Sequence, residues 1–233
     1  SDGEPATADD IMYWYEDIQL NEEMNPSGIG GMLAVKGEPV VIEKVDDYTV
    51  KWSFVDSYGI FIPWMASTRY NWCWSTYPKH YLSQFHPTYT KREDVEKLAT
   101  DEGYDDWLGL HGNRRDWRNV DLPCNRIWMP DRMPPDIPSS VVRNPYYWVV
   151  DPEGNQLPYL DEIWFADAEK GAERLMNFIA GTGDRTYVED AANFVTLRKK
   201  SLEPGSNMKI SYPLFIQGQE VLFNLSKDLG VKN

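Results

Sequence analysis

The sequence predicts an α/β fold, because stretches with helical periodicity alternate with stretches that have the periodicity of a strand. Near the N-terminus, apolar side chains recur at helical spacing at Ile11, Trp14, Tyr15 and Ile18. Between residues 41 and 54, apolar and polar side chains instead alternate with a period of two, which indicates a β-hairpin with one buried face. The chain has 233 residues, of which 42% are hydrophobic, and this is sufficient for one large domain or two small ones.

The first helix is expected to begin after Thr7, whose hydroxyl can cap it, and to end near Asn25-Pro26. A glycine-rich stretch, residues 26–31, comes next. Because no Lys-Ser or Lys-Thr pair follows these glycines, we interpret the stretch as a plain loop rather than a phosphate-binding loop. The hairpin that follows would turn at Asp46-Asp47.

Two more helices are predicted further along the chain. The first covers Lys91 to Leu110. The second runs from Glu169 to Ile179, and Gly181 is expected to stop it. The apolar faces of the two helices would consist of Val95, Leu98 and Ala99, and of Ala172, Leu175, Met176 and Ile179.

Proline and charge dominate residues 112–140, so little regular structure is expected there, and we place a boundary between two subdomains near Leu122. Turns are predicted at Asn144-Pro145 and Gly154-Asn155. The short strands expected around these turns and near the end of the chain are Val141-Val142, Glu162–Ala166 and Glu220–Leu225.

The chain is strongly acidic. Asp and Glu total 37 against 23 Lys and Arg, so the formal net charge is −14. Such a chain repels nucleic-acid phosphates and anionic lipid headgroups, and neither is expected as a partner. The sequence has no apolar run of about 18 to 20 residues that would predict a membrane span. Its first residues also lack the basic and apolar regions of a signal peptide.

Residues that commonly catalyse reactions or bind metals form no recognisable pattern. His80, His86 and His111 do not stand at helical metal-ligand spacing, and Cys73 and Cys124 belong to no Cys/His cluster, so no metal and no cofactor are expected. Each cysteine is interpreted as a small buried residue, with a disulfide as the alternative in an exported protein. No nucleophile motif is present, and no catalytic residue is assigned. Two carboxylates could serve a glycosidase as acid and base, but abundance alone favours a solvated surface.

The ten tryptophans are more informative. Trp64, Trp72 and Trp74 lie close together in sequence, and Trp128 stands alone in the proline-rich stretch. Flat, stiff side chains stack on sugar rings or line pockets for peptide side chains, although core packing is the commoner role of any single tryptophan. At least one or two of the set are expected to face a ligand.

Two adjacent segments resemble the signature of a known family. Residues 143–148 read RNPYYW, and residues 151–163 read DPEGNQLPYLDEI. Together they closely resemble the signature of the family 5 extracellular solute-binding proteins, which include the dipeptide-, oligopeptide- and cello-oligosaccharide-binding components of ABC importers. The resemblance extends over nearly the whole chain, through Asp2–Asp10, Pro78–Pro87, Ala180–Asp184 and Leu222–Leu225.

The resemblance implies a periplasmic-binding-protein-like fold of type II, cluster C, with mixed sheets and flanking helices. Residues 1–122 would form an accessory subdomain of the first lobe, and residues 123–233 part of its main sheet subdomain. Family members carry further strands before the Asp-Gly-Xaa-Pro segment and continue into a second lobe. Both are absent from this sequence, so the chain is expected to be a fragment.

The same resemblance implies capture of a solute without bond chemistry, outside the cytoplasm and at the cell surface. Ligand is held between two lobes, a hinge closes, and the closed form docks on permease subunits in the membrane. A peptide is placed slightly ahead of an oligosaccharide as ligand, and a carbohydrate-active enzyme is the alternative function. The candidate ligand-binding residues are Trp128, Asn125, Trp64, Trp72 and Trp74, and the candidate hinge residues are Phe223 and Asn224.

One stretch departs from the family pattern. Many relatives carry Leu-Pro-Thr-Leu before a tryptophan, whereas this chain reads LPCNRIW over residues 122–128, which leaves the ligand preference open. Because the second lobe is missing, the ligand-facing wall is expected to be open and aromatic, with Trp128, and also Trp64, Trp72 and Trp74, partly exposed. A single wall is expected to bind ligand more weakly than a complete cleft does.

Overall fold

The structure, a computed structural model, describes residues 2–66, 77–136, 138–165, 171–181, 184, 191–206 and 208–210. The chain divides into two compact units, Ser1–Asp167 and Ala168–Asn233. Helices and short strands follow one another along the chain, which confirms the predicted α/β class. Outside the described residues lie the predictions for Cys73, Trp72, Trp74, Phe223, Asn224 and the strand Glu220–Leu225.

The first unit opens with a helix that begins where the sequence predicts. Thr7 caps α1 (Ala8–Met12): its hydroxyl accepts a hydrogen bond from the backbone N–H of Asp9 at 3.3 Å, and the Asp10 carboxylate accepts one from the backbone N–H of Thr7 at 2.8 Å. The helix continues as a π-helical segment, η1 (Tyr13–Gln19), and so ends earlier than predicted.

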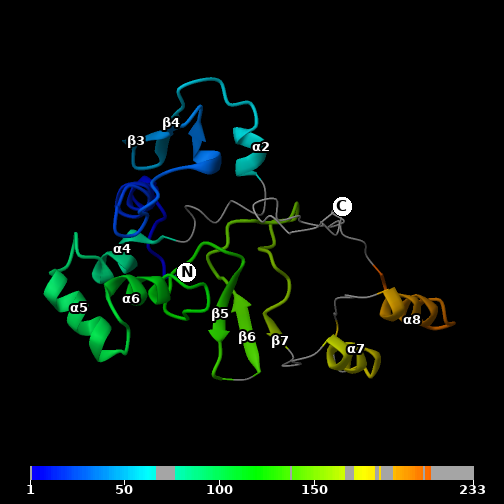
Figure 1. The fold of residues 1–233 in the computed structure, drawn as a ribbon. Helices are drawn as coiled ribbons and strands as arrows, with labels where there is room; N and C mark the ends of the chain where they lie inside the picture. Colours follow the sequence, from blue (N-terminus) through cyan, green and yellow to red (C-terminus); the bar gives the residue numbers. More distant parts are fainter. Residues whose placement is uncertain are drawn as a thin grey trace, which may run out of the picture. The chain divides into compact units, whose positions relative to one another are not determined.

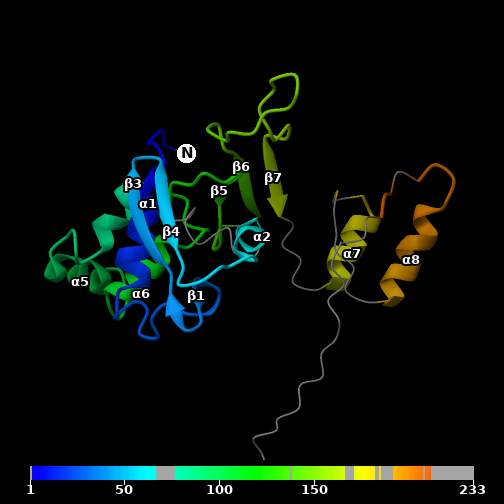
Figure 2. The same ribbon diagram turned by 90° about the horizontal axis from the view of Figure 1, so that it is seen from above.

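The predicted hairpin follows, as β3 (Val41–Asp46) and β4 (Thr49–Ser53), after the short pair β1 (Ala34–Val35) and β2 (Glu38–Pro39) and the 3₁₀ turn η2 (Gly31–Leu33). Ile42 pairs with Trp52, and their side chains face the core. Helix α1 lies against this hairpin (Figure 2), because the backbone N–H of Ala8 donates to the carbonyl of Asp47 at 2.8 Å. The apolar run after the hairpin forms helix α2 (Phe61–Met65).

The single helix predicted over residues 91–110 is wrong, because two helices occupy that stretch. Gly103 adopts a φ of 84°, which closes the first helix, and the Asp106 carboxylate caps the second by accepting from the backbone N–H of Gly109 at 2.8 Å. The helices of this part are α4 (Lys79–Leu82), η3 (Ser83–Phe85), α5 (Arg92–Asp101) and α6 (Trp107–Arg114).

A three-stranded antiparallel sheet closes the first unit, with the strand order β5-β6-β7 (Figure 1). Its strands are β5 (Trp128–Arg132), β6 (Ser139–Arg143) and β7 (Glu162–Phe165). The expectation of little regular structure before residue 140 was therefore wrong for β5. Pro130 is tolerated there because β5 is an edge strand, where a residue without an N–H breaks no second ladder.

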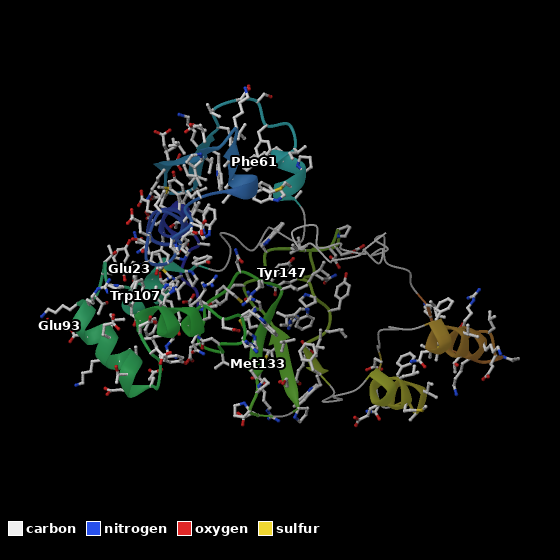
Figure 3. All side chains as sticks on the ribbon, in the orientation of Figure 1. Glu23, Phe61, Glu93, Trp107, Met133 and Tyr147 are labelled. Carbon is white, nitrogen blue, oxygen red and sulfur yellow. The ribbon has the colours of Figure 1, made fainter. Side chains whose placement is uncertain are left out.

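Two apolar clusters stabilise the first unit. The larger one gathers Trp14, Tyr13 and other residues of the first helix against the β3–β4 hairpin. The smaller one lies between α5 and α6 and includes Trp107. The indole N–H of Trp107 donates to a carboxylate oxygen of Glu23 at 3.1 Å, and Figure 3 shows these two side chains beside each other. Leu122 is buried in the larger cluster, and the expected subdomain boundary near it stays a prediction.

The second unit contains α7 (Gly171–Ile179) and α8 (Ala191–Ser201) among its described residues. Helix α7 ends at Ile179 as predicted, and Gly181, the predicted stop, follows with a φ of 81°. Leu175 is buried but Met176 is 63% exposed, so the predicted apolar face was too wide. Helix α8 was not predicted. No described helix combines the length and apolar character needed to cross a membrane.

Candidate functional site

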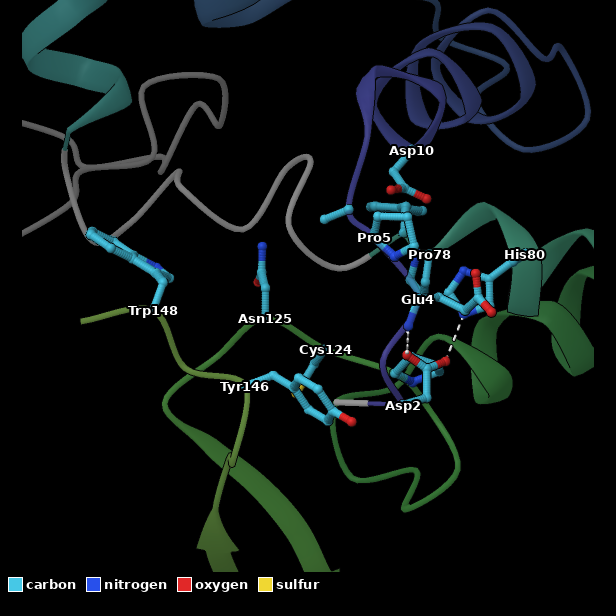
Figure 4. A pocket seen from close by; sticks show the side chains of 13 residues that line it. Asp2, Glu4, Pro5, Asp10, Pro78, His80, Cys124, Asn125, Tyr146 and Trp148 are labelled. Atoms are coloured by element: carbon cyan, nitrogen blue, oxygen red, sulfur yellow. Dashed lines mark hydrogen bonds and ion pairs between the residues drawn. The ribbon is translucent and has the colours of Figure 1, made fainter. Parts of the chain in front are cut away.

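An open cavity of about 320 Å³ lies in the first unit, where four segments of the chain meet (Figure 4). The segments are residues 2–6 ahead of α1, the start of α4, the loop at 123–125, and the turn after β6 that carries Tyr146 and Trp148. Loops from distant parts of the sequence are thus brought to one place by α1, α4 and the sheet.

Asn144 joins two of these segments. Its side chain is fully buried, and its amide nitrogen donates to the carbonyls of Cys124 at 3.1 Å and Arg126 at 2.8 Å. Its side-chain oxygen accepts from the backbone N–H of Tyr146 at 2.9 Å. This one amide therefore fixes the loop that carries Asn125 relative to the turn that carries Tyr146.

Carboxylates line the opposite side of the cavity. Asp2 accepts hydrogen bonds from the imidazole of His80 at 2.8 Å and from the backbone N–H of Glu4 at 3.3 Å. Partial burial alone would raise the pKa of Asp2, but the hydrogen bonds from His80 and Glu4 outweigh it and hold that pKa below its usual value. Asp10 accepts from the backbone N–H of Thr7 and, at 2.8 Å, from that of Lys79, which ties α1 to α4.

Aromatic side chains complete the cavity. Trp148 is 79% exposed and Tyr146 is 62% exposed, so both present ring surface to solvent. A Cβ at Gly3, which has a φ of 92°, would lie 3.3 Å from the hydroxyl of Tyr146. The close approach of these two segments thus favours glycine at position 3.

The structure places the predicted site residues at different points. Asn125 is exposed and lines the cavity. Trp128 is half-buried in β5 and does not belong to the cavity lining. Trp64 was expected to be partly exposed, but it is only 7% exposed, because it packs on Phe61 with their ring centroids 6.3 Å apart. Ligand contacts for Trp128 and Trp64 stay predictions.

The sequence interpretation did not assign Glu4, Tyr146 or Trp148 to the site. All three lie in segments that resemble the family signature, 2–10 and 143–148. The sequence therefore contained the motif, but the motif did not indicate that these three residues line a site. Their convergence on Asn125 depends on the tertiary fold, which spacing along the chain does not reveal.

The histidines form no metal centre in the described part of the chain, where no group of three or more His, Cys, Asp or Glu side chains has suitable geometry. His86 and His111 are instead buried in the aromatic core beside Tyr13. Burial, with smaller contributions from His86 and Arg115, lowers the pKa of His111 to about 3. Cys124 is buried, as predicted for a small apolar residue.

An α/β fold with an open cavity of aromatic and hydrogen-bonding side chains is typical of a protein that binds a polar solute. The chain belongs to the bacterial extracellular solute-binding proteins of family 5: the model of that family's middle region matches residues 1–221.

Individual relatives agree with this assignment. The periplasmic alpha-galactoside-binding protein of Rhizobium meliloti (strain 1021) is 30% identical over 236 residues, which cover 97% of this chain and 30% of the relative. The oligopeptide-binding protein OppA has a similar structure, with a TM-score of 0.75 and 34% identity over 86% of this chain and 31% of OppA. The periplasmic binding protein MelB of Agrobacterium fabrum C58, solved with stachyose, gives a TM-score of 0.61 and 30% identity over 88% of this chain and 28% of MelB. The chain thus spans about a third of the length of these relatives.

Proposed function

We propose that the chain forms part of the first lobe of a capture protein, which binds a peptide or an oligosaccharide outside the cytoplasm and delivers it to an ABC-type permease. The observation that carries this proposal is the family match over residues 1–221, together with the cavity around Asn125 and Trp148. The relatives are named as binding proteins for alpha-galactosides and oligopeptides, and one was solved with stachyose, which supports both ligand classes.

The relatives' names also support a periplasmic or extracellular location. Attachment to the cell surface and docking on permease subunits are part of the proposal. So is the division of the lobe into residues 1–122 and 123–233. The proposed ligand wall comprises Asn125, Trp128, Trp64, Trp72 and Trp74, and the proposed hinge comprises Phe223 and Asn224.

The physical mechanism is closure of two lobes on the ligand. A ligand that contacts both lobes binds the closed form more tightly than the open form, and so shifts the population towards closure. One wall alone forms only part of these contacts, while the entropy cost of association is unchanged. Affinity should therefore be several kcal/mol weaker for this chain than for a chain extended to the length of its relatives.

A paired calorimetric titration tests the proposal. The chain and its extended form are titrated with a peptide library and with cello-, xylo-, manno- and galacto-oligosaccharides. Tight binding of one class by the extended form, and weaker binding by this chain, is expected. Equal affinities of the chain and its extended form would show that the site lies wholly within these residues. If the extended form bound no ligand of either panel, the capture function would be contradicted.

A carbohydrate-active enzyme is the second candidate, because three carboxylates line the cavity: Asp2, Glu4 and Asp10. A glycosidase needs a general acid with a raised pKa, whereas hydrogen bonds from His80 and Glu4 outweigh burial and lower the pKa of Asp2. Asp10 is engaged by two backbone N–H groups. Both features favour binding without turnover. Release of product from any oligosaccharide, abolished by Glu4→Gln, would instead establish the enzyme.

A further inference from the structure

Three side chains of the cavity have polar groups or ring surface available to a ligand. Among the described residues, no hydrogen bond engages the side chain of Asn125 or Glu4, although both line the cavity. The indole of Trp148 presents most of its surface to solvent. In the view of Figure 4, Asn125 lies between Trp148 on one side and Glu4 on the other. An amide, a carboxylate and an aromatic face are therefore available to a ligand at one place.

The other two carboxylates of the cavity are committed to the fold. Both oxygens of Asp10 accept backbone N–H groups, one from Thr7 and one from Lys79. Both oxygens of Asp2 are engaged as well, one by His80 and one by the backbone N–H of Glu4. These groups shape the electrostatic field of the cavity without being its primary ligand contacts.

That field disfavours an anionic ligand. Among the described residues that line the cavity there is no lysine or arginine, and the one side chain of this set that can become cationic, His80, is paired with Asp2 at 2.8 Å. A ligand carboxylate or phosphate would meet the acidic side of the cavity, where none of these described residues supplies a cation to compensate for its desolvation.

The backbone of the cavity is poorly suited to a peptide chain. Extended peptides are commonly held by main-chain hydrogen bonds to a strand edge. Here none of the lining residues lies in a described strand, and Pro5, Pro78 and Pro123 supply no N–H donor. Recognition must therefore come mainly from side chains.

We propose that this cavity binds a neutral oligosaccharide, with the C–H face of one sugar ring on the indole of Trp148 and its hydroxyls bonded by the Asn125 amide and the Glu4 carboxylate. An amide both donates and accepts, and a carboxylate accepts from several hydroxyls, which matches the polar rim of a sugar. The aromatic face matches its apolar surface. This inference rests on the proposed function, because it names the ligand class of the same site.

The test uses ¹⁵N-labelled chain and follows the indole and amide signals of Trp148 and Asn125 by NMR, which detects weak binding. The probes are the neutral sugars raffinose and cellotriose, the acidic sugar trigalacturonate, and the peptides trialanine and trilysine. Trp148→Ala is compared with Trp117→Ala, since Trp117 is also exposed but lies outside the cavity. Dispersed spectra of each variant establish that it is folded.

Neutral sugars are expected to shift both signals, and Trp148→Ala to weaken their binding by about tenfold or more, while Trp117→Ala leaves it unchanged. Trigalacturonate is expected to bind at least several-fold more weakly. If peptides shift these signals and sugars do not, the ligand class is wrong but the capture function stands. Sugar binding that is unaffected by Trp148→Ala would overturn this cavity as the site. No response of these signals to either class would overturn this cavity as the site, while the titration of the extended form decides the capture function separately.

Discussion

The hydroxyl oxygen of Tyr13 lies 2.8 Å from Nε2 of His111, and both side chains are buried. This hydrogen bond links the π-helical segment η1 to helix α6 across 98 residues of sequence. The ring of His86 packs edge-on against both, with centroid distances of 5.9 Å to Tyr13 and 5.8 Å to His111. The aromatic core of the first unit is thus built around a polar contact, which makes it sensitive to loss of either partner.

Removing the Tyr13 hydroxyl should destabilise the first unit. Tyr13→Phe leaves a ring nitrogen of His111 buried without its partner, which costs about 1 to 3 kcal/mol of unfolding free energy. Urea denaturation measures this loss. Tyr89→Phe is the matched control, because the Tyr89 hydroxyl bonds Asp17 at an exposed position where water can replace it. Similar losses in the two variants would contradict a special role for the buried pair.

The buried histidines should make stability depend on pH. In the unfolded chain a histidine takes up a proton below about pH 6.5, whereas burial lowers the pKa of folded His111 to about 3. Burial also lowers the pKa of His86. The unfolded state therefore binds more protons in this window, and the free energy of unfolding falls as pH falls from about 6.5, by about 2 kcal/mol at pH 5 for His111 alone.

Urea unfolding between about pH 7 and pH 5 measures this dependence. His111→Gln should make the slope shallower, whatever its effect on absolute stability. His80→Gln is the control, because His80 is exposed at the cavity. An unchanged slope in His111→Gln would show that other groups govern the response to acid.

Asp10 should matter more for stability than the residue that caps the helix. Asp10→Ala removes the acceptor of two backbone N–H groups, those of Thr7 and Lys79. Thr7→Ala removes one acceptor, at 3.3 Å from the N–H of Asp9. We expect losses of about 2 to 3 kcal/mol and about 1 kcal/mol respectively. Thermal unfolding of both variants gives the comparison, and a larger loss in Thr7→Ala would contradict the link between α1 and α4.

Features with a local cause were predictable from the sequence. The Thr7 cap, the β3–β4 hairpin and the turn at Asn144-Pro145 each depend on residues within a few positions of one another. The same holds for the helix end at Gly181, where glycine adopts positive φ. The break at Gly103 and Asp106 also had a local signal, a glycine followed by a capping aspartate, which the long apolar pattern of residues 91–110 obscured.

Features that depend on tertiary contacts were not predictable. Pro130 argues against a strand by its chemistry, and only its place at a sheet edge permits β5. The cavity is a further case, since Asn125 was a candidate but Trp148 and Glu4 reach it from segments more than 20 residues away in sequence. Trp64 was predicted to be partly exposed but is buried, because its aromatic neighbour Phe61 covers it, and this contact too depends on the fold.

Asn144 should be essential for both the fold and the cavity, because its side chain makes three hydrogen bonds in a fully buried position. Asn144→Asp keeps the shape but replaces the donor with an acceptor, which then faces the carbonyls of Cys124 and Arg126. An ionised carboxylate there would be buried against two carbonyl oxygens, and we expect a loss of about 3 kcal/mol or more. Asn144→Ala should cost less, since it removes bonds without adding a charge.

Asn144→Asp should also release the loop that carries Asn125. Without the Asn144 amide, the segment of Cys124 and Arg126 is no longer fixed to the turn of Tyr146, so the NMR signals of Asn125 and the Trp148 indole should shift or broaden. Asn113→Asp is the matched control, because Asn113 is exposed on α6 and lies outside the cavity. It should change neither the unfolding free energy nor these signals. If Asn144→Asp leaves the folded protein's Asn125 and Trp148 signals in place, the two cavity segments are held together by other contacts, and Asn144 does not position the site.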